Sequence, residues 1–262
     1  MRHLKILAYY FAQYFKARLA YQGDFFIALF TSFIATIASF GFLYILFNRV
    51  SSLQGWSFEE LLFIYGFALI CLGVFNVLSM NLYEFGERYI MEGRFDQILL
   101  RPLHSLFQVL FEAFRIESLQ EVFTGLAVVG YAWYKLQLPV TLVDLILFPI
   151  MITCGVVIYL SVFVILSSLS FWFEDRVGVS PPIFNMIPFG RYPITIYNSF
   201  LQFLLSWIIP FAFASFYPTT YFLGRNEFGL FFAIVPLVSF CFLILALFVW
   251  NYGVRGYQST GS

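Results

Sequence analysis

The chain contains few of the residues on which enzymes and metal sites depend. Its two histidines are His3 and His104, and its three cysteines each lie inside an apolar run. Neither set has the spacing of metal ligands or a redox pair, and no histidine-based triad can be assembled within the membrane. Glu59 and Glu60 have no histidine placed to complete a protease-like metal site, so we interpret them as charges complementing a helix N-terminus. We predict no catalytic residue, no metal site and no cofactor on this chain.

Lysine is also scarce, which bears on nucleotide binding. A phosphate-binding loop needs a lysine that follows glycine. Lys5, Lys16 and Lys135 instead follow leucine, phenylalanine and tyrosine. The sequence therefore excludes a nucleotide-binding loop of this type. If the protein uses ATP, the ATP and its magnesium ion would be bound by another chain.

Charge is low throughout the 262 residues. Only 11% of residues are charged, the formal net charge is zero, 61% are hydrophobic and the mean hydropathy is +0.87. A soluble domain of this size could not bury so much apolar surface, and the neutral balance gives no support for a nucleic-acid partner. The composition predicts an all-α polytopic membrane protein, because a helix satisfies its own backbone hydrogen bonds within lipid.

Apolar runs divide the chain into membrane elements. We predict one transmembrane domain over residues 1–262, beginning with an amphipathic helix that lies in the plane of the membrane over 1–22. The six expected spans cover residues 25–47, 58–82, 115–134, 142–173, 197–216 and 228–250. Pro210 interrupts the fifth of these.

The distribution of basic residues predicts the orientation. Six spans place both termini on one side, which would carry Arg2, Lys5, Lys16, Arg18, Arg88, Arg94, Arg101, Arg176, Arg191 and Arg255. The other side would carry only Arg49, Lys135 and Arg225. Because basic residues are enriched in cytoplasmic loops, we expect both termini in the cytoplasm.

The longest polar interval covers residues 84–104 and is far longer than a turn between two helices requires. Apolar residues recur between its charges as on a short amphipathic helix, namely Tyr89, Ile90, Phe95, Ile98, Leu99 and Leu100. Gly93 interrupts this pattern and Pro102 ends it. Two interpretations stay open: an element that lies on the membrane surface or against a partner protein, and a solvated interfacial loop.

A second group of charges precedes the apolar part of the third span. Glu112 and Arg115 are three residues apart and can pair on one helix face, and Glu117 and Glu121 share a face four residues apart. We interpret the group mainly as a structural cluster at the membrane boundary; a cytoplasmic entrance for a polar or zwitterionic substrate head is the alternative. The other mid-span regions are essentially uncharged, which argues against an ion-coupled carrier.

Several stretches together resemble a known family. They are GERYIMEGRFDQILLRPL between the second and third spans, RYPITIY, IIPFAFASFYPTTYFLG before the last span, and WNYGVRGYQSTGS at the end. Each stretch alone is weakly specific, whereas their order and spacing are more so. With the in-plane helix and the six spans, nearly the whole chain resembles the permease subunit of a bacterial type-2 ATP-binding-cassette (ABC) exporter, in the small six-span branch.

The resemblance implies a coupling helix within residues 84–104 that sits in a groove of a separate ATPase. The coupling residues would be Glu87, Arg88, Tyr89, Glu92, Gly93, Arg94, Phe95, Asp96, Leu99, Leu100 and Arg101. Their charges would set the register and their apolar side chains would fill the groove. Two ATPase chains and two permease chains, identical or homologous, would form one transporter in the bacterial inner (plasma) membrane.

The resemblance also implies a pathway between the two permeases, lined chiefly by the first, second and fifth spans. The break at Pro218 to Glu227 would be a short re-entrant or extracellular helix pair that closes the outer exit. The gate residues would be Pro210, Pro218, Tyr221 and Gly224. An ordinary proline-induced helix end is the alternative interpretation. An apolar, aromatic lining without buried charge suits a lipid, a glycolipid or another amphipathic cargo, exported from the cytoplasm or the inner leaflet.

Two other functions stay open from the sequence alone. A membrane-embedded lipid-modifying enzyme would be active when purified without an ATPase. A non-transporting scaffold of an ATPase complex would show no substrate-dependent change in the ATP turnover of its partner. The leading expectation is a permease that is not itself an enzyme.

Overall fold

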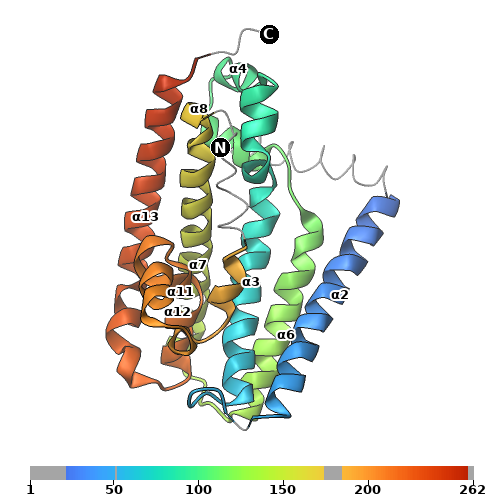
Figure 1. Cartoon of the computed structure of the whole chain (residues 1–262), viewed down its shortest axis with the longest axis vertical. Coiled ribbons are helices and arrows are strands. Elements are labelled where there is room, and N and C mark those ends of the chain that lie inside the picture. Colours follow the sequence, from blue (N-terminus) through green and yellow to red (C-terminus); the bar gives the residue numbers. More distant parts are fainter. Residues whose placement is uncertain (1–21, 51, 174–184, 259–262) are drawn as a thin grey trace.

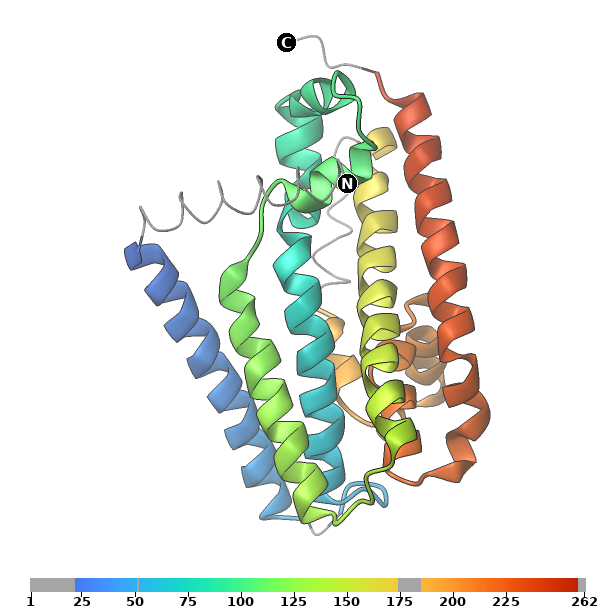
Figure 2. The ribbon, with the colours of Figure 1, turned by 180° about the vertical axis from the view of Figure 1, so that it is seen from behind.

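The computed structural model describes residues 22–50, 52–173 and 185–258, which are mostly helical and include no strand. Five long helices lie alongside one another in a bundle (Figures 1 and 2): α2 (Gln22–Phe47), α3 (Phe58–Tyr83), α6 (Leu119–Lys135), α7 (Leu142–Ser168) and α13 (Gly229–Gly256). The in-plane helix expected over 1–22 lies outside the described residues, apart from Gln22, which begins α2.

The two ends of the bundle differ in construction (Figure 1). One end, which we call the α4 end, carries the short elements η1 (Phe85–Met91), α4 (Arg94–Leu99), α5 (Ser105–Phe111) and α8 (Ser170–Phe173). The other end, which we call the loop end, consists of the connections 48–57, 136–141 and 223–228. Both candidate regions from the sequence therefore have a defined place, at opposite ends of one bundle.

Local sequence explains where two of the long helices begin. The Ser57 hydroxyl accepts from the Glu60 backbone N–H, and the Glu60 carboxylate accepts from the Ser57 N–H at 2.8 Å. Thr141 and Asp144 form the same arrangement at the start of α7. Each capping box satisfies two backbone donors that a helix start otherwise leaves unpaired. These two helices are thus anchored at the loop end.

Helix α3 is the centre of the bundle, with α6 on one side and α7 on another. The backbones of α3 and α6 approach closely at Gly66 and Gly125, since a Cβ atom at Gly66 would lie 3.1 Å from the Gly125 carbonyl oxygen. Small residues allow such approach within a membrane, where packing rather than the hydrophobic effect holds helices together. In contrast, α2 and α13 expose large apolar side chains such as Phe30 and Phe240.

Four helical stretches are long and apolar enough to cross a membrane: Phe25–Phe47, Phe58–Ser79, Leu142–Phe173 and Asn226–Gly256. They make the chain a multi-pass membrane protein. Helix α6, expected as the span 115–134, has 17 residues and follows the short turn η2 (Ile116–Ser118). The count of six spans stays a prediction.

The interval expected as the fifth span, 197–216, is not one helix. It is divided among α10 (Ser199–Phe203), η5 (Leu204–Ile208), α11 (Phe211–Ala214) and α12 (Phe216–Phe222). Pro210 has no backbone N–H and cannot continue a helix, and Ile209 before it has φ −123° and ψ 82°. The chain therefore reverses near Pro210 instead of running straight through the bundle.

The two arms on either side of Pro210 lie against each other and form what we call the loop-end hairpin, residues 199–222. The Ser206 and Tyr217 hydroxyls lie 3.1 Å apart, and the rings of Trp207 and Phe213 lie 5.7 Å apart. Figures 1 and 2 place the labelled arm α11–α12 in the half of the bundle nearer the loop end. Phe222, at its end, contacts Trp133 near the end of α6.

The placement of Arg191 corrects one expectation about orientation. Arg191 was expected beside the termini, but its guanidinium donates to the Tyr65 hydroxyl at 3.0 Å, two turns from the loop end of α3. Other arginines of that set, such as Arg88, Arg94 and Arg255, belong to elements at the α4 end. The reason for the difference is that the segment 187–196 runs between α3 and the hairpin instead of staying at the α4 end.

Candidate functional site

The charged segment, residues 84–104, folds back on the α4 end as two short helical turns. The first is η1, whose π-helical geometry ends at Glu92. Gly93 then adopts a left-handed conformation with φ +71°, which L side chains rarely adopt, and α4 follows. Glycine at position 93 thus permits the sharp change of direction between the two turns.

Aromatic rings attach this segment to the bundle. The Phe95 ring lies 5.7 Å from that of Phe85, 5.2 Å from Phe171 of α8 and 5.1 Å from Tyr257 after α13. Trp250 of α13 lies 4.9 Å from Phe85 and donates to the Ser105 hydroxyl at 3.0 Å. We call the six rings of Phe85, Tyr89, Phe95, Phe171, Trp250 and Tyr257 the aromatic cluster. It connects the charged segment to α8, which follows α7, and to the end of α13.

Hydrogen bonds fix the same face of the segment. The Tyr89 hydroxyl donates to the Glu112 carboxylate at 2.6 Å. Burial, and then this hydrogen bond, raise the pKa of Tyr89 above its ordinary value, so the phenol keeps its proton. The buried amide of Gln108 donates to the carbonyls of Ile98 and Leu103, each at 3.0 Å. The ends of α4 and of the following turn are therefore held by α5.

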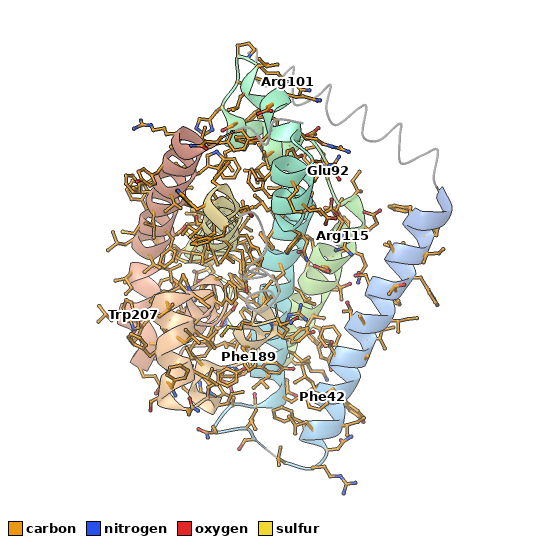
Figure 3. The ribbon with its side chains drawn as sticks, turned by 45° about the horizontal axis from the view of Figure 1, so that its top comes forward. Phe42, Glu92, Arg101, Arg115, Phe189 and Trp207 are labelled. Carbon is orange, nitrogen blue, oxygen red and sulfur yellow. The ribbon has the colours of Figure 1, made fainter. Side chains whose placement is uncertain are left out.

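The structure separates the expected coupling residues into two groups. Tyr89 and Phe95 are buried, and Arg88, Gly93 and Asp96 are partly buried. The remaining members are exposed: Glu87, Glu92, Arg94, Leu99, Leu100 and Arg101. Leu100 is 86% exposed, and Arg101 projects from the α4 end (Figure 3). The Phe95 ring lies inside the aromatic cluster. That it fills a groove of a partner stays a prediction.

The four charges expected near the boundary of the third span do not form one group. Glu112 accepts from Tyr89, and Glu121 accepts from the Asn76 amide at 2.9 Å. Glu117 is 2% exposed, whereas Arg115 is exposed and its backbone N–H donates to the Val77 carbonyl. Helix α5 ends at Phe111, so the pairing of Glu112 with Arg115 on one helical face does not arise. A cytoplasmic entrance built from all four stays a prediction.

An open apolar groove lies beside this region, between α2 and the start of α6. It encloses about 530 Å³ and is lined by Phe26, Ile27, Leu29, Phe30, Phe33 and Gln120. Gln120 is its polar residue, and its amide oxygen accepts from Ser32 of α2 at 2.9 Å. The groove could hold a hydrocarbon chain, with one polar group at its wall.

At the loop end, the four expected gate residues occupy different parts of the hairpin and its exit. Pro210 lies at the reversal and Pro218 lies in the buried first turn of α12. Tyr221 and Gly224 border a cavity of about 310 Å³ that also touches Trp133 and Asp144. Gly224 has φ +67°, which allows the turn from α12 toward α13.

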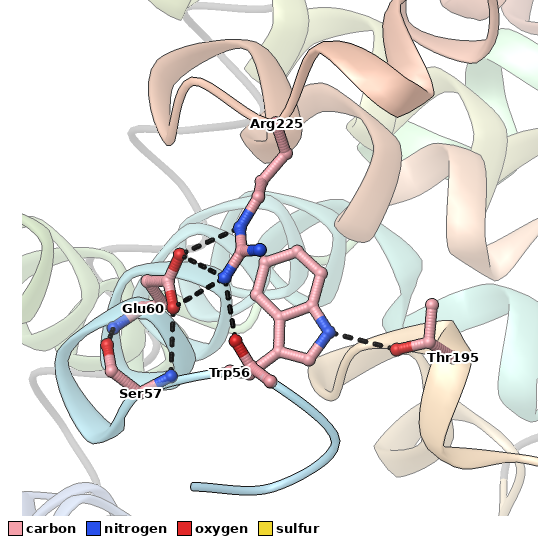
Figure 4. A network of polar contacts seen from close by, with 6 residues as sticks. Trp56, Ser57, Glu60, Thr195 and Arg225 are labelled. Atoms are coloured by element: carbon pink, nitrogen blue, oxygen red, sulfur yellow. Dashed lines mark hydrogen bonds and ion pairs between the residues drawn. The ribbon is translucent and has the colours of Figure 1, made fainter.

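A polar network that the sequence analysis did not identify joins the hairpin to α3 (Figure 4). The Arg225 guanidinium donates to both carboxylate oxygens of Glu60, at 3.0 Å each, and to the Gly55 carbonyl at 2.8 Å. Its Cζ lies 4.5 Å from the centre of the Trp56 ring, and Trp56 Nε1 donates to the Thr195 hydroxyl at 2.9 Å. We call the Arg225–Glu60 pair, with Gly55 and Trp56, the clamp.

The sequence carried a partial signal for the clamp. Ser57 and Glu60 have the spacing of a capping box, which predicts a fixed carboxylate at the start of α3. The partner, Arg225, is 165 residues away in the chain, and no local pattern identifies it. Among the described residues, no group of three or more His, Cys, Asp or Glu side chains could hold a metal ion.

Comparison with known proteins identifies the family. The family described as ABC-2 family transporter protein matches residues 33–261, which is most of the chain. No curated protein and no solved structure matches the sequence. The match extends across α3, the charged segment, the hairpin and α13, so it includes both ends of the bundle. The chain belongs to the ABC-2 transporter family and is a permease subunit of that type.

Proposed function

We propose that this chain is the membrane permease of an ATP-driven exporter in which the charged segment docks on a separate ATPase. The family match supports a transport subunit of an ABC exporter. In the proposed complex, two ATPase chains bind the ATP and magnesium, and a second permease completes the pathway. The α4 end faces the cytoplasm of a bacterial cell, and so do both termini.

The observation that carries the proposal is the two-sided character of the charged segment. One side holds Phe85, Phe95 and Ile98, which are buried against the bundle. The other side presents Arg94, Leu100 and other exposed residues to whatever covers the α4 end. A partner that pushes the exposed side would therefore move the ends of α3, α7 and α13 together, through the aromatic cluster.

The cargo that fits best is amphipathic. The open groove beside α2 is lined by four phenylalanine or leucine side chains, one isoleucine and Gln120. It accepts an acyl chain or another apolar body more readily than an ion or a sugar. The loop-end hairpin closes the far end of the bundle in this proposal, so cargo would leave past it.

The test compares two exposed leucines at opposite ends of the bundle. Leu100 is 86% exposed at the α4 end, and Leu142 is 80% exposed at the loop end. Tagged wild type, Leu100→Ala and Leu142→Ala would be purified in mild detergent from the native host, and vanadate-sensitive ATP hydrolysis of each eluate measured. We expect activity to fall about tenfold for Leu100→Ala, the effect of losing an interface anchor, and to stay at wild-type level for Leu142→Ala.

Two results would contradict the docking assignment. One is full ATP hydrolysis in the Leu100→Ala eluate. The other is an equal loss for Leu142→Ala, because that would indicate a general effect of removing exposed leucines. A wild-type eluate that hydrolyses no ATP would count against the ATPase partner itself.

A further inference from the structure

The clamp holds both ends of the loop-end hairpin at a single short segment. Thr195, before the hairpin, is bonded by the Trp56 indole, and Arg225, after the hairpin, is bonded by Gly55 and Glu60. The segment 196–224 between those two points is thus tied at the start of α3 (Figure 4). Residues 55–60 therefore control where both arms of the hairpin enter and leave.

The underside of the hairpin is fixed differently. Residues Phe211 to Ala214 are buried against α7, with the Phe211 ring 5.1 Å from that of Tyr159. Gly155 of α7 brings the two backbones together, because a Cβ atom there would collide with the Ala214 carbonyl oxygen. These contacts are mainly apolar and non-directional. The Ser215 hydroxyl donates to the Gly190 carbonyl, which ties the hairpin to the segment before it and not to α3. The directional contacts that tie the turn after the hairpin to the start of α3 lie at the clamp.

The clamp is partly open to solvent, and the N-terminal cap of α3 uses contacts of its own. The Arg225 side chain is 31% exposed and that of Glu60 is 14% exposed, so water and salt reach the ion pair. Glu60 keeps its capping bonds to Ser57 when Arg225 leaves, and α3 therefore keeps its start. The interaction has one end on a fixed helix and the other on the turn that follows the hairpin.

We propose that Arg225 and Glu60 are positioning residues that latch the loop-end hairpin closed, and that release of the clamp opens the loop end. Only the purpose of that opening, the exit of cargo, rests on the proposed transport function. Arg225 acts through the hairpin and needs no contact with cargo.

A native cysteine reports the opening. Cys71 of α3 is fully buried, and position 155 lies beside both its sulfur and the Ala214 carbonyl oxygen. Lifting α11 away from α7 would therefore uncover Cys71. Cys154 and Cys241 would be replaced by alanine, which leaves Cys71 as the single thiol for labelling by a maleimide in lipid nanodiscs.

The matched control is a cysteine buried at the other end of α7. Ser168 is fully buried and differs from cysteine by one atom. It would be changed by Ser168→Cys in a chain that also carries Cys71→Ser. Global loosening of the bundle raises labelling at both sites, whereas hairpin opening raises it at Cys71 alone.

We expect Arg225→Ala to raise the Cys71 labelling rate about tenfold, the effect of losing charge-assisted hydrogen bonds, with no change at Ser168→Cys. The Cys71 labelling rates of Glu60→Gln and Arg225→Lys should lie between those of wild type and Arg225→Ala, because glutamine keeps the cap and lysine keeps the charge. Salt near 1 M should raise the wild-type rate and leave that of Arg225→Ala unchanged.

The proposal is overturned if Arg225→Ala labels at the wild-type rate, or if Cys71 and Ser168→Cys labelling rise together. The measurement uses the purified chain without any ATPase. It therefore stands or fails separately from docking at the α4 end.

Discussion

At the α4 end, the charged segment is attached by six packed aromatic rings, whereas at the loop end the turn that follows the hairpin is tied to α3 by one arginine that is held by a carboxylate, a carbonyl and an indole. Ring packing has little dependence on salt and involves many atoms at once. A partly exposed ion pair is directional, and salt weakens it. The first arrangement suits a part that must move with the helices, and the second suits a part that must be released from them.

Each end of the bundle also has a close contact that only a glycine allows. At the loop end, Gly155 lets the hairpin backbone rest directly on α7, and at the α4 end, Gly253 gives room to the Phe171 ring of the aromatic cluster. In both places a side chain would push a neighbour away. The loop-end contact is between backbones, while the α4-end contact is with an aromatic ring, so a side chain added at either glycine would displace a neighbour.

The largest expected effect is the loss of Phe95 from the aromatic cluster. Phe95→Ala should lower the free energy of unfolding by about 3–5 kcal/mol, because it leaves a cavity among rings that cannot close over it. Unfolding in detergent would be followed by tryptophan fluorescence, to which Trp250 of the cluster contributes.

The matched variant is Phe200→Ala, which removes a ring that is 70% exposed on the hairpin. It should change the free energy of unfolding by less than about 1 kcal/mol. If the two variants lose equal stability, the aromatic cluster does not hold the α4 end in the way described.

A smaller effect is expected at the loop end from Gly155→Ala. The added methyl group would meet the Ala214 carbonyl oxygen and the Cys71 sulfur, so the hairpin or α7 must shift. Overpacking of this kind costs about 1–3 kcal/mol. Thermal unfolding of the purified chain in detergent would measure the loss.

Gly130→Ala on α6 serves as the control, since no atom lies within 4 Å of a Cβ atom at that position. It should be neutral or stabilising by up to about 1 kcal/mol, because alanine favours helix over glycine. A loss for Gly130→Ala as large as that for Gly155→Ala would remove the argument from close approach.

The sequence was sufficient for the helical membrane class because uncharged apolar runs of about 20 residues match the thickness of a bilayer and rarely occur in soluble domains. It was insufficient for residues 197–216, where composition is equally apolar in a crossing helix and in a hairpin. Pro210 signalled a break, but a proline can kink a helix or reverse the chain, and only the packing of Ser206 against Tyr217 decides between them. The placement of Arg191 beside Tyr65 depends on the same reversal.

In the candidate sites too, local sequence patterns were informative, whereas contacts between residues far apart in the chain could not be predicted. The alternation of charged and apolar residues over 84–104 predicted one apolar face that includes both Phe95 and Leu100, but Phe95 is buried and Leu100 is 86% exposed. The direction of each face could not be predicted, since it depends on Phe171 and Tyr257 far along the chain. Tests of the coupling role therefore belong on the exposed residues.

The smallest expected effect is a loss of stability at alkaline pH that originates at Tyr257, at the α4 end. Burial, and then the neighbouring Asp96 carboxylate, raise the pKa of Tyr257 from 10.0 to about 12. The folded state therefore favours the protonated phenol. This stabilisation is fully present below about pH 10 and is lost as the pH rises toward 12.

Tyr257→Phe should remove this part of the pH dependence. Unfolding midpoints of wild type and Tyr257→Phe would be compared at pH 9 and near pH 11.5, with an expected difference of roughly 0.5 kcal/mol at the higher pH after allowance for solvent screening. Other buried tyrosines titrate in both chains and cancel in the comparison. If the two chains lose stability in parallel, Tyr257 makes no contribution to the loss of stability at alkaline pH. A difference in stability that appears only at high pH would assign the pH dependence to the α4 end. A labelling rate that responds to salt in wild type but not in Arg225→Ala would assign the salt dependence to the loop end.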